Sequence, residues 1–144
     1  MEAGGAVIGG VLSGTSGDGV DVAFARLHVK DEGAGTQPAS LEPLAFTCSP
    51  FPEPLAESLR AVLDGATPSL QEVAMLHRDL GVAFGRAVAA LAAETGHEPA
   101  LVGSHGQTVW HHDGAPREER ATLQLGDADH VAERAGCWVV SDFR

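Results

Sequence analysis

The sequence predicts an α/β fold whose mixed sheet starts with an antiparallel β-hairpin and is flanked by helices. Short apolar or alternating segments of strand length occur near both ends of the chain, and segments with helical periodicity separate them. The 144 residues, 44% of them hydrophobic, are enough for one domain with a buried core. We expect three strands, two helices, a strand, a short strand, a helix and a final strand, in that order.

A β-hairpin is predicted at the start of the chain. Residues 6–12 form a continuous apolar run that is typical of a buried strand. Residues 20–29 alternate between apolar and small or polar side chains, which indicates a second strand. Between them, residues 13–19 contain three glycines and three small hydroxyl residues. We therefore expect a tight, glycine-rich turn.

A third strand and a short helix are expected next. Residues 30–40 are polar and glycine-rich, and we expect them to form a mobile connection. Residues 41–48 predict a strand. Pro43 within it indicates either an edge strand or a strand that starts late. Residues 54–63 predict a short helix that ends near Gly65.

The clearest helix signal begins at Ser69. Ser69 and Glu72 have the spacing of a capping box, and Gly96 suits the left-handed residue that ends a helix. Gly81 and Gly85 lie inside this helix, where each costs about 1 kcal/mol relative to alanine, so we expect another element to pack closely against them. One apolar stripe recurs every three or four residues, formed by Val73, Leu76, Leu80, Phe84, Val88 and Leu91.

Four further elements are predicted: strands at 100–103 and 122–125, a helix at 128–135 capped by Asp127, and a buried strand at 137–140. The polar segment 104–108 is expected to follow the first of these strands as a loop. The charged residues 113–120 are expected to form a solvent loop. A domain seldom stops at a central strand, so we expect the polypeptide to continue past Arg144.

Charge, apolar run length and cysteine spacing together exclude several classes of partner and location. Nine Lys and Arg face twenty Asp and Glu, a net charge of −11, so no broad nucleic-acid-binding surface can form. No apolar run approaches the roughly 20 residues of a membrane span, and no secretory signal is visible. Cys48 and Cys137 are far apart and lack CxxC spacing, which is typical of proteins in a reducing cytoplasm.

The first candidate site is the glycine-rich turn, residues 13–21. Its backbone N–H groups can form a nest that binds phosphate without a lysine, and its serine and threonine hydroxyls add donors. Asp18 and Asp21 are suited to hold Mg²⁺, directly or through water. The segment is not a Walker A loop, since no Gly-Lys-Ser/Thr follows. An ordinary hairpin turn is the alternative interpretation.

The second candidate site is the polar segment 103–108. It follows a predicted strand, and ligands of open α/β sheets bind at the carboxyl ends of strands. Ser104, His105, Gln107 and Thr108 supply donors and acceptors suited to the hydroxyls of a sugar. The alternative is a polar turn whose side chains satisfy their own backbone.

Two smaller features complete the candidate residues. His111 and His112 are adjacent, so on a strand they point to opposite faces and are unsuited to share a metal ion. We expect one of these imidazoles to face the cleft and the other to face solvent. Asp142 directly follows the last predicted strand, where it is placed to contact a ligand; a solvated terminus is the alternative.

Four motifs, in order along the chain, resemble the anhydro-N-acetylmuramic acid kinase family. They are residues 13–21 (SGTSGDGVD), 103–108 together with the two histidines, 122–127 (TLQLGD) and 139–144 (VVSDFR). The resemblance covers the whole chain but well under half of a family member. It implies an actin-like sugar kinase with an RNase H-like fold in each of two lobes. Residues 1–144 would be the N-terminal lobe, and the C-terminal lobe is absent.

The resemblance also implies an activity. Such an enzyme hydrolyses the 1,6-anhydro ring of anhydro-N-acetylmuramic acid and transfers the γ-phosphoryl of ATP to O6, giving N-acetylmuramic acid 6-phosphate for cell-wall recycling. The ATP phosphate loop would be Gly14, Thr15, Ser16, Gly17, Asp18, Gly19, Val20 and Asp21, with Mg²⁺ at Asp18. The sugar cleft would include Ser104, His105, Gln107, Thr108 and Asp142. A homodimer is expected for the full-length protein.

Two departures from the family pattern stand out. The family usually has Leu or Met where this chain has Gly17, and a glycine there is expected to loosen the loop. The catalytic aspartate that activates water is expected just beyond Arg144, so we expect the isolated chain to be inactive. A non-catalytic phosphate- or sugar-binding module and one half of a split kinase are the alternative functions.

Overall fold

The structure is a computed structural model that describes residues 5–28, 40–114 and 116–143. Its elements follow the predicted order: β1 (Ala6–Leu12), β2 (Gly19–His28), β3 (Ser40–Pro50), α1 (Glu53–Leu63), α2 (Leu70–Thr95), β4 (Leu101–His112), the 3₁₀ helix η1 (Arg117–Glu119), β5 (Ala121–Leu125), α3 (Ala128–Ala135) and β6 (Trp138–Ser141). Of the predicted connection 30–40, the structure describes Ser40 alone. Val29 and residues 30–39 lie outside the described residues.

The strands form one mixed sheet, as predicted. Its order is β3-β2-β1-β4, and both β5 and β6 pair with β4. The β1–β2 and β2–β3 pairs are antiparallel, whereas β4 is parallel to both β1 and β6. Pro43 lies in the edge strand β3, where a missing N–H donor is tolerated.

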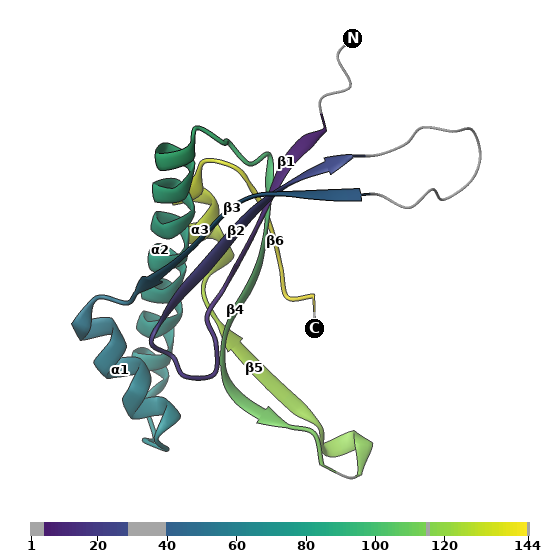
Figure 1. Cartoon of the computed structure of the whole chain (residues 1–144). Helices are drawn as coiled ribbons and strands as arrows, with labels where there is room; N and C mark the ends of the chain where they lie inside the picture. Colours follow the sequence, from purple (N-terminus) through teal and green to yellow (C-terminus); the bar gives the residue numbers. More distant parts are fainter. Residues whose placement is uncertain (1–4, 29–39, 115, 144) are drawn as a thin grey trace.

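The three α-helices lie on one side of the sheet (Figure 1). Alternate side chains of the central strands point toward them and form the core, including Val11, Val22, Phe24 and Val102, each at most 2% exposed. Gly9 is essential to this packing. A Cβ there would lie 3.0 Å from Val102 Cγ2 and 3.1 Å from the Phe24 ring, so the two larger side chains pack over the space that Gly9 leaves.

The local signals around α2 are confirmed. The hydroxyl of Ser69 accepts a bond from the Glu72 N–H at 3.3 Å, and Glu72 Oε2 accepts one from the Ser69 N–H at 2.7 Å. Gly96 ends the helix with φ 70°. Gly81 and Gly85 pack against α3 so closely that a Cβ at either would overlap its backbone or the Asp127 cap. Close packing therefore compensates for two poor helix formers.

Two predicted strands differ from those observed. The strand expected at 100–103 is the start of the 12-residue β4, which continues through the polar segment 104–108. Gly106 (φ 76°) allows the bend at which β4 leaves β1 and pairs with β5. The strand expected to be buried and central at 137–140 is β6, which pairs only with β4 among the described strands. Trp138 on it is 82% exposed.

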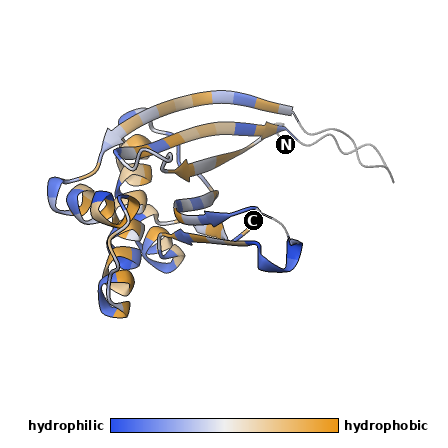
Figure 2. Cartoon of the chain, turned by 90° about the horizontal axis from the view of Figure 1, so that it is seen from below, coloured by the Kyte–Doolittle hydropathy of each residue, from blue (hydrophilic) through white to orange (hydrophobic). Residues whose placement is uncertain are grey.

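The face of the sheet opposite the helices is apolar and exposed. Register places Phe46 beside Ala23, Ile8 beside Leu101, and Leu101 beside Trp138. Apolar side chains thus run across the sheet from β3 to β6. Figure 2 shows the ribbon coloured by hydropathy, with hydrophobic and hydrophilic residues along both the strands and the helices. We call this surface the open face; its exposed members are Leu12, Leu41, Phe46, Leu101, Trp138 and Val140. Such continuity is more than the scattered apolar exposure of an ordinary surface.

No helix in the described part of the chain is both long and apolar enough to cross a membrane.

The capping box at Ser69 and Glu72 predicts how the stability of the fold changes at acid pH. Hydrogen bonds from Ser69 hold the pKa of Glu72 below its ordinary value of 4.5. The folded state therefore binds the Glu72 proton less tightly than the unfolded state, so the stabilisation is present above pH 4.5 and is lost as the pH falls through the lowered pKa. Glu72→Gln should lower the free energy of unfolding at pH 7, and the difference from wild type should shrink toward pH 3. Glu57→Gln is the control, and urea unfolding measures both. Equal changes in the free energy of unfolding for Glu72→Gln and Glu57→Gln would contradict the assignment of this stabilisation to the capping box.

The open face should bind a hydrophobic dye while the chain is folded. Phe46→Glu and Trp138→Glu place a charge on this face and should each reduce the fluorescence of bound anilinonaphthalene sulfonate severalfold, with circular dichroism unchanged. Leu70→Glu is the matched control, because Leu70 is 84% exposed at the start of α2, away from the open face. Dye binding that responds to Leu70→Glu alone would show that the dye binds elsewhere.

Candidate functional site

The glycine-rich turn, residues 13–18, joins β1 to β2 at the carboxyl end of β1. The Gly17 N–H donates to the Gly14 carbonyl at 3.1 Å and closes the turn. The Ser16 hydroxyl donates to Asp18 Oδ1 at 2.9 Å. Gly14, Thr15 and Ser16 are exposed. The predicted glycine-rich turn is therefore a compact loop with an exposed rim.

Gly17 occupies the interior of this turn rather than its rim. It has φ 62°, in the left-handed region that favours glycine. A Cβ at this position would lie 2.6 Å from Leu63 Cδ1 and 3.2 Å from Leu59 Cδ2. Helix α1 thus covers the turn, and a side chain at this point would require the Leu63 side chain to shift.

The other predicted loop residues have different surroundings. Asp18 is exposed, and its backbone carbonyl accepts a bond from Phe51 N–H at 3.2 Å. Val20 is 2% exposed and belongs to the core, so only its backbone is placed to meet a ligand. Asp21 lies across from Cys48. A hydrogen bond with Asp21, together with partial desolvation and the charges of Asp21 and Asp18, raises the pKa of the Cys48 thiol.

A pocket of about 340 Å³ lies where the parallel part of β4 and the end of β6 meet the start of α3. The polar side chains lining it are His77, Ser104, His105, Gln124, Asp127, Asp129, Ser141 and Asp142. Its lining includes no lysine or arginine. Three residues predicted from two separate motifs are brought together here: Ser104 and His105 from segment 103–108, and Asp142 from the end of the chain.

Two of these residues have unusual conformations or environments. Ser104 is 2% exposed, and its hydroxyl has no hydrogen-bond partner among the described residues. Asp142 has φ 55°, the one left-handed non-glycine residue in the described chain. The turn at Asp142 brings the Phe143 ring to 6.4 Å from the His105 ring, centroid to centroid. Polar groups held in this way are typical of binding sites.

Sequence reasoning missed His77, which shapes the pocket. The Gly126 N–H donates to His77 Nδ1 at 2.9 Å, and the Asp127 N–H donates to the His77 carbonyl at 3.0 Å. Because Nδ1 accepts a bond, neutral His77 carries its proton on Nε2. A polar residue beside the apolar stripe of α2 was the available signal, but its partners are 49 residues away.

Gln107 and Thr108 do not line the pocket. Gln107 is fully buried, and its Nε2 donates to the Gly14 carbonyl and to the Thr108 carbonyl, both at 3.1 Å. The hydroxyl of Thr108 accepts a bond from Gln124 Nε2 at 3.3 Å. Both residues therefore lie between the turn and the pocket, in contact with protein atoms.

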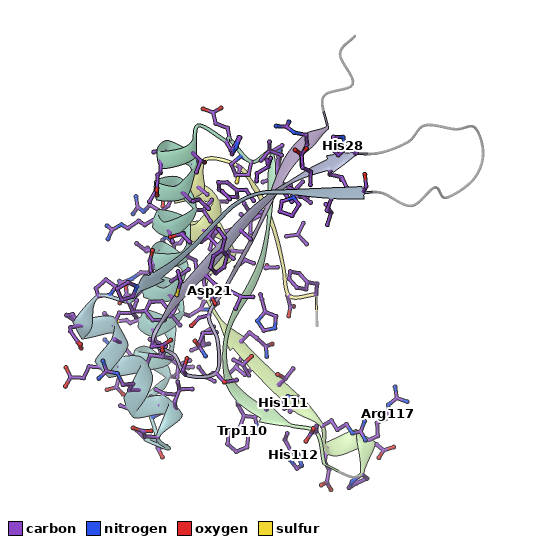
Figure 3. All side chains as sticks on the ribbon, viewed as in Figure 1. Asp21, His28, Trp110, His111, His112 and Arg117 are labelled. Carbon is purple, nitrogen blue, oxygen red and sulfur yellow. The ribbon has the colours of Figure 1, made fainter. Side chains whose placement is uncertain are left out.

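His111 and His112 lie on the projecting arm formed by β4 and β5, with Trp110 beside them (Figure 3). Both histidines are exposed and neither lines the pocket, so the expectation that one of them faces the cleft stays a prediction. His111 is 3.8 Å from Asp113. In the described part of the chain, no group of three or more His, Cys, Asp or Glu side chains could hold a metal ion.

A larger groove of about 990 Å³ runs between α1 and α2. Small and apolar side chains form most of its lining, and Val20 is the single predicted site residue among them. Volume alone would favour this groove as the ligand-binding site, but the polar side chains suited to chemistry line the smaller pocket.

Strand order and site together define a class of protein. A sheet ordered β3-β2-β1-β4, with β6 parallel to β4 and helices between the parallel strands, is compatible with an RNase H-like lobe of the actin-like ATPases. The glycine turn after β1 lies at the carboxyl edge of the parallel strands, where such sheets bind ligands.

The family model for anhydro-N-acetylmuramic acid kinase matches residues 6–144, and the chain belongs to this family. It is 40% identical over 142 residues to the anhydro-N-acetylmuramic acid kinase of Salinibacter ruber, covering 94% of this chain and 34% of that protein. It is 38% identical over 138 residues to that of Gloeobacter violaceus, covering 94% and 35%. The chain thus spans about a third of the length of these curated relatives.

The position of Gly17 predicts a stability effect. Gly17→Ala should lower the free energy of unfolding by about 1–2 kcal/mol, because an L side chain is strained in the left-handed region and meets Leu63. Gly14→Ala is the matched control: its Cβ would have Ser16 Oγ at 3.8 Å as its nearest neighbour. Thermal or urea unfolding compares the two. A Gly17→Ala protein as stable as wild type would show that the turn adopts another conformation in solution.

Proposed function

We propose that this chain is the N-terminal lobe of a kinase that opens the 1,6-anhydro ring of anhydro-N-acetylmuramic acid and phosphorylates O6 with ATP. The product would be N-acetylmuramic acid 6-phosphate, an intermediate of cell-wall recycling. One observation carries the proposal. A glycine turn suited to phosphate and a pocket suited to hydroxyl groups lie at the same edge of the sheet, in a chain that belongs to this kinase family.

The proposed nucleotide site is the turn together with the start of β2, Gly14 to Asp21. Its exposed rim presents backbone N–H groups and the hydroxyls of Thr15 and Ser16. Backbone donors of this kind bind phosphate oxygens, which suits a chain of net charge −11 with few cations to offer. The remainder of the nucleotide site would come from the C-terminal lobe.

Asp18 is the proposed contact to Mg²⁺. Mg²⁺ in nucleotide sites is held by one or two carboxylates together with substrate phosphates and waters. The exposed Asp18 carboxylate beside the turn fits this requirement, since one of its oxygens accepts from Ser16 and the other is available. When bound, Mg²⁺ would neutralise charge on the transferring phosphoryl group.

The polar pocket is the proposed site for part of the sugar. Ser104, His105 and Asp142 can donate to and accept from hydroxyl groups. Three aspartates in the lining, which has no lysine or arginine, favour a hydroxylated ligand over a phosphate at this point. The aspartate that activates water would lie beyond Arg144. Two free cysteines support a cytoplasmic location.

The proposal is tested by product formation in the full-length protein. Mass spectrometry should detect N-acetylmuramic acid 6-phosphate from ATP, Mg²⁺ and the anhydro sugar. Asp18→Asn should reduce kcat/KM about a hundredfold, the size typical of losing one group that stabilises transition-state charge. Asp113→Asn, on the projecting arm, is the control and should behave as wild type.

The isolated 144-residue chain provides a second arm of the same experiment. It should form no product, because phosphoryl transfer requires both positioning and charge stabilisation from the complete cleft. Turnover by this chain alone would contradict the two-lobe proposal. Sugar or phosphate binding by a full-length protein without turnover would favour a binding module, and activity restored by a separate polypeptide would favour a split kinase.

A further inference from the structure

Gln107 is a polar side chain buried away from any pocket. Its side-chain amide is fully buried beside the bulge of β4. Nε2 makes two donations, to the carbonyls of Gly14 and Thr108, while Oε1 has no partner among the described residues. A buried glutamine that reaches 93 residues back along the chain to a single loop carbonyl constrains that loop.

The bonded carbonyl belongs to the peptide at the rim of the turn. Gly14 C=O accepts both the turn-closing bond from Gly17 N–H and the bond from Gln107. A trans peptide is planar, so the N–H of Thr15 points opposite to the carbonyl of Gly14. By holding this carbonyl toward the protein interior, Gln107 turns the Thr15 N–H outward, toward the exposed side of the loop.

The same side chain connects the turn to the strand that carries the pocket. Gln107 follows Gly106, whose carbonyl accepts a bond from Ser13 N–H at 3.5 Å. Ser104 and His105 lie three and two residues earlier on β4. Gln107 therefore links the turn to the strand that carries the polar pocket.

We propose that Gln107 is a positioning residue for nucleotide binding: it orients the Gly14–Thr15 peptide so that the Thr15 N–H meets a phosphate oxygen. This inference rests on the proposed function in taking the ligand to be a nucleotide. The geometry assigned to the turn does not depend on that function. It assigns Gln107 a role different from the direct sugar contact predicted from the sequence, because a fully buried side chain is out of reach of a ligand.

Gln107→Met separates this role from simple packing. Methionine has nearly the same length but removes both donations, so the carbonyls of Gly14 and Thr108 each lose a donor. A purely structural role therefore predicts a loss of stability without a selective effect on ATP. In the full-length protein we expect the KM for ATP to rise about tenfold and the KM for the sugar to change less than twofold. Gln71→Met, on the exposed surface of α2, is the matched control. A folded Gln107→Met protein with an unchanged KM for ATP would overturn the proposal.

Gln107→Glu provides a readout that packing does not move. A protonated carboxyl keeps one donor for the Gly14 carbonyl, whereas an ionised carboxylate has none. The ratio of the variant's KM for ATP to that of wild type should therefore increase as the pH is raised from 6 to 9. The wild-type protein measured at the same pH values is the reference. A ratio that stays constant across this range would count against the donor role.

Amide hydrogen exchange keeps the inference separate from the proposed function. In the 144-residue chain without nucleotide, Gln107→Met should accelerate exchange of the Gly17 amide, which donates to the Gly14 carbonyl, about tenfold, and Gln71→Met should leave it unchanged. Faster exchange in a protein whose full-length form does not use ATP would refute the kinase proposal while supporting the loop geometry. Unchanged exchange would refute the positioning role even in an active kinase.

Discussion

The central position of β1 is the constraint on which the rest of the structure depends. This strand pairs antiparallel with β2 on one side and parallel with β4 on the other. It can do so because Gly9 leaves space for Phe24 and Val102 from the neighbouring strands to pack over it. The pairing with β2 demands a tight turn, and the pairing with β4 places that turn beside the carboxyl ends of β4 and β6. One seven-residue strand thereby brings the two candidate sites to one edge.

The helix face and the open face of the sheet differ in what packs against them. On the helix face, Gly81 and Gly85 let α2 approach α3 until their backbones touch, which positions the cap of α3 and the pocket beside it. The open face has no helix against it among the described residues, so apolar side chains from Phe46 to Trp138 stay exposed. The same strands serve both faces, since side chains alternate along each of them.

The candidate site depends on polar groups that the core would otherwise exclude. Gln107 and Ser104 are buried beside apolar neighbours, and each retains an oxygen without a partner in the described residues. Burying such groups costs free energy, and nothing in the apolar core requires them. Their placement is understandable if this edge of the sheet is built for ligands: Ser104 faces the pocket, and Gln107 holds the turn that presents backbone donors.

Local chemistry was enough to predict most elements: the capping box at Ser69, the left-handed Gly96, the alternating β2 and the glycine turn each depend on residues within a few positions. The candidate residues Ser104, His105 and Asp142 were named because each follows a predicted strand. Only the tertiary structure decided the rest. β4 extends through its polar segment because β5 pairs with it. Trp138 and Val140 of β6 are exposed because no described element packs on the open face, and Gln107 is buried where it reaches Gly14. In each case the determining partner is distant in sequence, and a local pattern carries no signal of it.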